Sequence, residues 1–90
     1  MPKLSRQGDK NQAGGAIQRG AATVFANGTA VGLHVSSITA HAPWESPHST
    51  ATTSSASPSV FCEGAQVLRV GSTNTCGHSI VTGSEDIFVP

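Results

Sequence analysis

The sequence predicts an all-β domain, a small conical β-prism built from three pseudo-repeated hairpins. The composition favours short strands and tight turns, because Gly, Ser, Thr, Ala and Val dominate and tyrosine is absent. A unit with the core Val-Phe-x-x-Gly also recurs along the chain. A single unit is too small to bury an apolar face, so we expect three units to pack around one axis. An ordinary small β-sandwich or barrel fits short strands with turn signals as well.

Length and charge limit the classes of function. The 90 residues form one domain, spanning residues 1–90. A chain of this size buries a thin core and often needs a metal, a disulfide or a partner. The formal net charge is zero and only 11% of residues are charged, which argues against nucleic-acid binding. The first 15 residues lack the apolar middle of a signal peptide, so we expect synthesis in the cytoplasm without export by the general secretory route.

The repeated strands each carry a phenylalanine at the same place. "TVFANGTAV" at 23–31 matches "SVFCEGAQV" at 59–67, and "DIFVP" at 86–90 resembles the same strand interrupted by the end of the chain. Phe25, Phe61 and Phe88 are therefore predicted to be equivalent.

A second element precedes two of these strands. "GGAIQRGAATVF" at 14–25 resembles "GHSIVTGSEDIF" at 77–88. Each contains a short apolar strand around Ile17 or Ile80 and then Gly20 or Gly83, which predicts hairpins that turn at these glycines. The Ser- and Thr-rich segment 49–57, "STATTSSAS", is typical of a flexible loop.

Three links join the units. The first link, "RQGDKNQAGG" at 6–15, parallels the third link, "RVGSTNTCGH" at 69–78, and the second link is "LHVSSITAHA" at 33–42. This register makes Asp9, Ser36 and Ser72 equivalent, with spacings of 27 and 36 residues. The longer second spacing places extra residues inside 42–57.

The links hold the candidate metal ligands. His41 lies at the end of the second link and His48 lies in its insert, while Cys76 and His78 end the third link. Equivalent link ends meet at one pole if the units share an axis. Three imidazoles and one thiolate form a complete tetrahedral set for zinc, and this set suits zinc better than iron. Such a closed site is structural and adds folding free energy. The alternative is that these histidines are solvated loop residues.

Other residues have simpler interpretations. His34 lies in an apolar run away from the link end and is left out of the site. Cys62 replaces Ala26 in the repeated strand, which indicates a small core residue. A disulfide between Cys62 and Cys76 is disfavoured by the expected cytoplasmic origin.

Enzyme chemistry is not expected. No nucleophile motif, phosphate-binding loop or metalloprotease motif occurs in the sequence. Glu45 could act as a general base only beside a metal with an open coordination position. Trp44, at the tip of the insert, could cover the metal pole or anchor a ligand. A small zinc-stapled binding module that uses the Trp44 loop is therefore the alternative function.

The order of these motifs resembles the PAAR-repeat family, the sharpened tips of contractile injection machines. The resemblance rests on "SRQGD" at 5–9, "TVFANGTAV" at 23–31, "VFCEGAQVLRVGS" at 60–72 and "TCGHSIVTGSEDIFV" at 75–89. It covers nearly the whole chain. The family implies a conical β-prism with zinc held near its point by three histidines and one cysteine, here His41, His48, Cys76 and His78.

The resemblance also implies a partner and a location. The blunt base of such a tip sits on the flat end of a trimeric β-helical spike, with one chain per trimer, and the point meets the envelope of the target cell. A pseudo-threefold base suits a true threefold surface. The expected role is structural, with no enzyme activity and no nucleic-acid partner.

The chain departs from the family signature. Pro-Ala-Ala-Arg is missing, since "TAVGLH" stands in the first place and "AQVLRV" keeps only Arg69. The second Gly-Asp is replaced by Val35-Ser36 and the third by Gly71-Ser72. This divergence, together with the lack of a toxin-bearing extension, favours the spike tip of a bacteriophage tail baseplate over that of a type VI secretion system.

Overall fold

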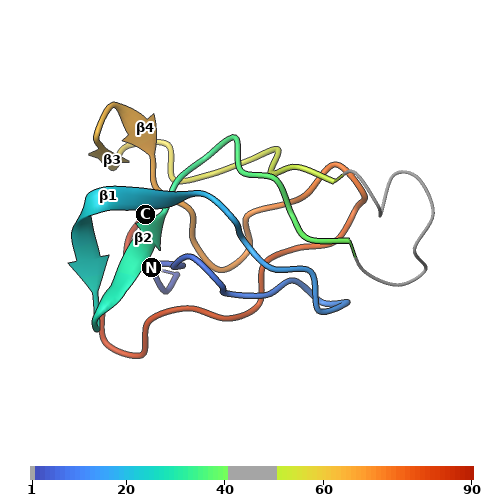
Figure 1. Ribbon diagram of the computed structural model, residues 1–90, viewed down its shortest axis with the longest axis horizontal. Coiled ribbons are helices and arrows are strands. Elements are labelled where there is room, and N and C mark those ends of the chain that lie inside the picture. Colours follow the sequence, from blue (N-terminus) through green and yellow to red (C-terminus); the bar gives the residue numbers. More distant parts are fainter. Residues whose placement is uncertain (1, 41–50) are drawn as a thin grey trace.

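The protein is an all-β domain with a broad hairpin end and a narrower link end. The computed structural model describes residues 2–40 and 51–90, and these residues contain β1 (Gly20–Ala26), β2 (Thr29–Gly32), β3 (Phe61–Cys62) and β4 (Ala65–Gln66). β1 pairs with β2 and β3 pairs with β4, both antiparallel. Figure 1 shows both hairpins and both chain termini at one end of the long axis, which we call the base. The turns of the first and third links lie at the other end, the apex. No helix in the described ranges could cross a membrane.

The hairpins turn at Asn27–Gly28 and at Glu63–Gly64. All four residues have positive φ, from 52° to 82°. Two successive residues with positive φ are the requirement of a type I′ turn, whose twist matches the flanking strands. The prediction that the hairpins turn at Gly20 and Gly83 is therefore wrong.

Gly20 and Gly83 serve close packing instead of turning. Gly20 begins β1, and a Cβ atom there would lie 2.9 Å from the Cβ of Ala30. A Cβ atom on Gly83 would lie 2.6 Å from the backbone oxygen of Leu4. Both glycines allow another segment to approach their backbone closely, which is a common reason for glycine within a strand.

A closed ring of backbone hydrogen bonds marks the pseudo-threefold axis. The amide of Ser5 donates to the carbonyl of Leu68 at 2.9 Å, Leu68 donates to Gly32 at 2.9 Å, and Gly32 donates to Ser5 at 3.0 Å. These residues occupy equivalent places in the register that the sequence predicted. The ring confirms three similar units around one axis.

The same cyclic pattern recurs nearer the apex. Three isolated bridges each join the inner strand of one unit to the link of the next: Ile17 with Ile38, Thr53 with Asn74, and Ile80 with Asn11. Thr53 thus takes the place held by Ile17 and Ile80 in the other units.

The prediction of a flexible loop over 49–57 is wrong for residues 51–57, the part that the structure describes. Ala51, Thr53 and Ser57 are buried. Thr53 donates its amide to the carbonyl of Ser36 at 2.9 Å. The polar composition of this segment did not indicate that Thr52 and Thr53 form bridges with neighbouring links.

The third hairpin has no covalent turn. The amide of Leu4 donates to Ile87 at 2.9 Å, and the amide of Val89 donates to Pro2 at 2.9 Å. Lys3 and Phe88 form an antiparallel bridge between these bonds. The last strand of the repeat is therefore completed by the N-terminal residues, and the two ends of the chain close the prism.

Two apolar clusters fill the interior. The base cluster contains Leu4, Ala21, Ala26, Val31, Leu33, Val67 and Val89. The apex cluster contains Ile17, Ile38, Ala51, Leu68 and Ile80, with Cys76 packed against it. The base cluster contains mainly Ala and Val, whereas four of the five buried residues of the apex cluster are Ile or Leu.

Val89 and Phe88 allow a matched test of the closing strand. Val89 is 8% exposed in the base cluster, whereas the neighbouring Phe88 is 47% exposed. Val89→Asp would bury an unpaired charge and should lower the free energy of unfolding by roughly 3 kcal/mol. Phe88→Asp should change it little. Urea unfolding of both variants checks this expectation, and equal losses would contradict the described pairing of the termini.

Candidate functional site

A tight turn in the third link brings Cys76 and His78 together. Gly77 has φ of 92° and donates its amide to Asn74 at 3.0 Å, while Asn74 donates to the carbonyl of His78 at 2.7 Å. The turn places the sulfur of Cys76 3.4 Å from Nδ1 of His78. Both residues are half-buried. Two of the four predicted metal ligands therefore lie side by side at the apex.

The first link forms the same turn without ligands. Gly14 has φ of 89° and donates to Asn11 at 3.1 Å, and Asn11 donates to Gly15 at 2.8 Å. Ala13 and Gly15 occupy the places that Cys76 and His78 hold in the third link. The first link can therefore contribute no metal donor from these positions.

A buried amide pair joins the first and third links. Nδ2 of Asn11 donates to Oδ1 of Asn74 at 2.9 Å, and both side chains are 3% exposed. Ile38 takes the equivalent place in the second link. The apex is thus organised around one polar pair and one apolar side chain.

The other two predicted ligands, His41 and His48, lie outside the described residues, as do Trp44 and Glu45. Within residues 2–40 and 51–90, no group of three or more His, Cys, Asp or Glu side chains is placed to hold a metal ion. The four-ligand zinc set therefore stays a prediction, of which the structure describes the Cys76 and His78 half.

The chain that flanks residues 41–50 is fixed at the apex. The amide of Ile38 donates to the carbonyl of Ala51 at 2.8 Å. The amide of Thr75 donates to Thr52 at 2.8 Å. These bonds hold the residues on either side of the segment next to each other and next to Thr75, the residue before Cys76.

The cysteines belong to different parts of the fold. Within the described residues, neither Cys62 nor Cys76 forms a disulfide bond. Cys62, predicted to be a small core residue, is half-buried at the edge of the base cluster, and Cys76 packs against the apex cluster. Burial raises the pKa of the Cys62 thiol, and the carboxylate of Glu63 raises it further. Cys62 therefore stays protonated, which disfavours it as a metal ligand.

The base carries three equivalent exposed phenylalanines. Phe25, Phe61 and Phe88 are 60%, 61% and 47% exposed. They lie in β1, in β3 and in the closing C-terminal strand, which Figure 1 places at the base. We call these three residues the phenylalanine ring. The sequence predicted their equivalence but not their exposure, because apolar residues on both sides of each phenylalanine hide which face is buried.

Side-chain bonds tie each hairpin turn to the neighbouring unit. The carboxylate of Glu63 accepts hydrogen bonds from the hydroxyl of Thr23 at 2.6 Å, from the amide of Thr23 at 2.9 Å and from the amide of Ala22 at 3.0 Å. The hydroxyl bond and then the amide bonds lower the pKa of Glu63.

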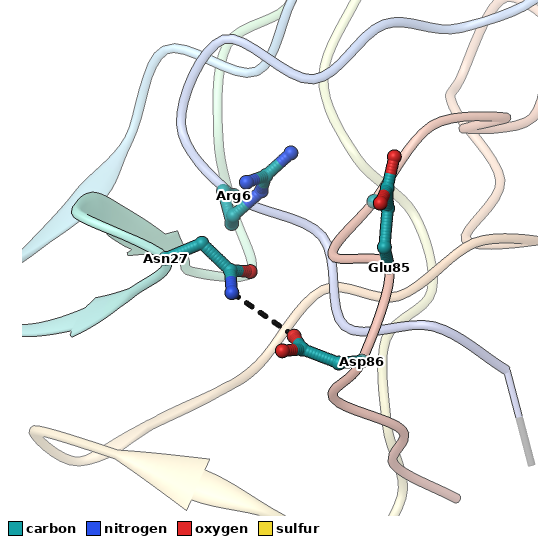
Figure 2. A pocket seen from close by; sticks show the side chains of 5 residues that line it. Arg6, Asn27, Glu85 and Asp86 are labelled. Atoms are coloured by element: carbon teal, nitrogen blue, oxygen red, sulfur yellow. Dashed lines mark hydrogen bonds between the residues drawn. The ribbon is translucent and has the colours of Figure 1, made fainter.

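The first hairpin turn makes the corresponding tie. Figure 2 shows the amide of Asn27 directed at Asp86, and Nδ2 lies 2.9 Å from Oδ1. This bond, and then one from Ser84, lower the pKa of Asp86. The corners that carry the phenylalanine ring are thus held by bonds to ionised carboxylates.

The contact between arginine and aspartate that the family signature implies is present in the first link. Nε of Arg6 lies 3.2 Å from Oδ2 of Asp9 in the first link. In the third link Ser72 replaces the aspartate, and its hydroxyl accepts from the amide of Arg69 at 3.1 Å. Nε of Arg69 is buried and has no hydrogen-bond partner among the described residues. The loss of the aspartate therefore leaves one donor unsatisfied.

Comparison with known protein families agrees with this architecture. The family model of the PAAR motif matches residues 7–82. The chain therefore belongs to the PAAR motif family, whose members are structural spike-tip proteins of contractile injection systems that sit on spike proteins. No match was found among curated proteins.

Ser72→Asp should create in the third link the contact between arginine and aspartate that the first link has. The new carboxylate would pair with Nε of Arg69 as Asp9 pairs with Arg6. A partly buried donor that gains a charged partner should raise the free energy of unfolding by about 1 kcal/mol. Thermal unfolding of Ser72→Asp, Arg69→Leu and the double variant forms the cycle that isolates this pair. A gain that persists without Arg69 would contradict the assignment.

Proposed function

We propose that this chain caps the central spike of a contractile tail and gives it a rigid point. The phenylalanine ring carries this proposal, because it places an apolar side chain at each of three equivalent corners of the base. A trimeric β-helical spike ends in a surface with true threefold symmetry. One chain with three similar corners can meet all three subunits of such a trimer, so one chain binds each spike.

The chemistry of the base suits a protein partner. Six large apolar side chains are exposed in the described part of the molecule, and half of them form the phenylalanine ring. Aromatic residues are enriched where protein interfaces exclude water. Seating on the spike would also cover the short edge strands of the hairpins, which are otherwise open to pairing with other chains.

The apex supplies the point. Cys76 and His78 fit a zinc site, because a sulfur and an imidazole nitrogen lie 3.4 Å apart and both ends of the segment 41–50 are fixed nearby. In this proposal His41 and His48 complete the set. Zinc with four protein ligands is closed and structural, and it would tie the second and third links together. The tip then pierces the outer membrane of the target cell as part of a bacteriophage tail baseplate.

Metal content tests the apex. Cys76→Ser and His78→Ala should each reduce bound zinc from about one ion per chain and lower the melting temperature, since each removes one of four ligands. His34→Ala is the matched control and should retain the metal. Plasma mass spectrometry on the purified proteins measures the zinc.

The same measurement can reject the ligand set. Equal zinc content in all three variants would remove Cys76 and His78 from the site. A folded parent protein without any metal would make His41 and His48 ordinary residues of the second link and its insert, and it would leave the proposal for the base untouched.

Spike binding tests the base. The triple variant Phe25→Ser, Phe61→Ser, Phe88→Ser should lose binding to the trimeric β-helical spike protein of the same tail, because it removes all three apolar contacts. Val81→Ser changes a 49% exposed apolar residue outside the ring and serves as control. Native mass spectrometry of co-expressed proteins should show one parent chain per trimer. Unimpaired binding by a folded triple variant would contradict the proposed interface.

A further inference from the structure

Two of the three links close their turn with a glycine and a backbone carbonyl. Gly8 donates its amide to Ile17 at 2.9 Å in the first link, and Gly71 donates to Ile80 at 2.8 Å in the third. Both glycines have positive φ, 92° and 96°. In both links this closing bond joins two backbone groups and involves no titratable side chain.

The second link replaces this turn with side chains. Val35 occupies the place of the glycine and has φ of 64°, a conformation that a β-branched residue adopts only under constraint. Its amide donates to the hydroxyl oxygen of Thr53 at 3.0 Å. The amide of Ser36 donates to the same oxygen at 3.1 Å. One hydroxyl therefore holds the strained turn.

Hydrogen-bond counting assigns the proton of this hydroxyl. A threonine oxygen accepts two hydrogen bonds and donates one. Val35 and Ser36 occupy both acceptor positions of Thr53, so its proton must be donated. Nδ1 of His34 lies 3.1 Å from the hydroxyl oxygen, and it can accept this proton when the ring carries its own proton on Nε2.

The groove beside His34 contains a cation and, in its described lining, no anion. Nη1 of Arg19 donates to the backbone oxygen of His34 at 2.6 Å and brings a guanidinium to the same groove. Phe61 and Gln66 line the groove from β3 and β4, and its described lining contains no carboxylate. The nearby Glu63 is bonded to Thr23 of β1 instead. A protonated His34 would find no anion here.

We propose that His34 and Thr53 form a proton-sensitive clasp on the second link. Neutral His34 accepts the proton of Thr53 and leaves both acceptor positions of the hydroxyl for Val35 and Ser36. A proton on Nδ1 of His34 makes that nitrogen a donor, and Thr53 then has one acceptor position too few. One bond breaks, and the strained turn at Val35 loosens. The clasp stands independently of the proposed spike and metal.

Nuclear magnetic resonance on the full chain tests the clasp directly. At pH 8 the ring nitrogens of His34 should show the tautomer with the proton on Nε2. Lowering the pH to about 5, where an imidazole is protonated, should shift or broaden the amide signals of Val35 and Ser36. Those of Gly8 and Gly71 should stay in place, because their turns lack a histidine.

His34→Gln supplies the matched variant. The glutamine oxygen can accept from Thr53 and does not titrate, while His41, His48 and His78 remain in both proteins. The melting temperature of the parent should therefore fall between pH 8 and 5 by about 4 to 8 °C more than that of His34→Gln, the change expected for one hydrogen bond in a domain of this size. Thr53→Ser should keep the pH response, and Thr53→Val should abolish it.

Three results would overturn the clasp. The first is a His34 ring with its proton on Nδ1 at pH 8. The second is a pair of Val35 and Ser36 amides that do not respond to acid. The third is an equal loss of melting temperature in the parent protein and in His34→Gln.

Discussion

The ring of backbone hydrogen bonds that joins Ser5, Gly32 and Leu68 is the constraint on which the rest of the structure depends. Buried amides and carbonyls must find partners, and at the centre of this prism each strand can find them only in the other two units. The strands must therefore approach closely. Gly32 fits this demand, because a Cβ atom there would lie 3.2 Å from the oxygen of Ser5. Small buried side chains such as Ser36 and Ser72 fill equivalent places further along the links.

The three units differ most in their links. The first link keeps the Arg6 and Asp9 pair of the family signature and has no candidate ligand in its turn. The third link gives up the aspartate but places Cys76 beside His78. The second link exchanges a glycine turn for Val35 held by Thr53, and it leads into the segment with the remaining predicted ligands. The common ring at the axis allows these differences because it uses backbone atoms alone.

At the base, in contrast to the links, the three units are alike. A phenylalanine remains exposed at each corner although one corner is a meeting of chain termini and two are covalent turns. Glu63 and Asn27 hold the two turns to neighbouring strands through different chemistry. Similar exposure reached by different local bonds is the reason why this surface, and not the apex, supports the proposal of a symmetric partner.

The sequence alone determined the all-β class, the threefold register and the family, because repeated motifs survive in the order of residues. It also determined that Cys76 and His78 are neighbours, since one glycine separates them in a turn. Tertiary structure decided the rest. Glycine marks both turns and close packing, so only the fold could show that Gly20 packs and Gly28 turns. The segment around Thr53 has the composition of a loop, yet Thr53 forms an antiparallel bridge with Asn74. The N-terminal residues pair with the last strand and complete its hairpin. This contact joins the two ends of the chain, so no local sequence pattern could indicate it.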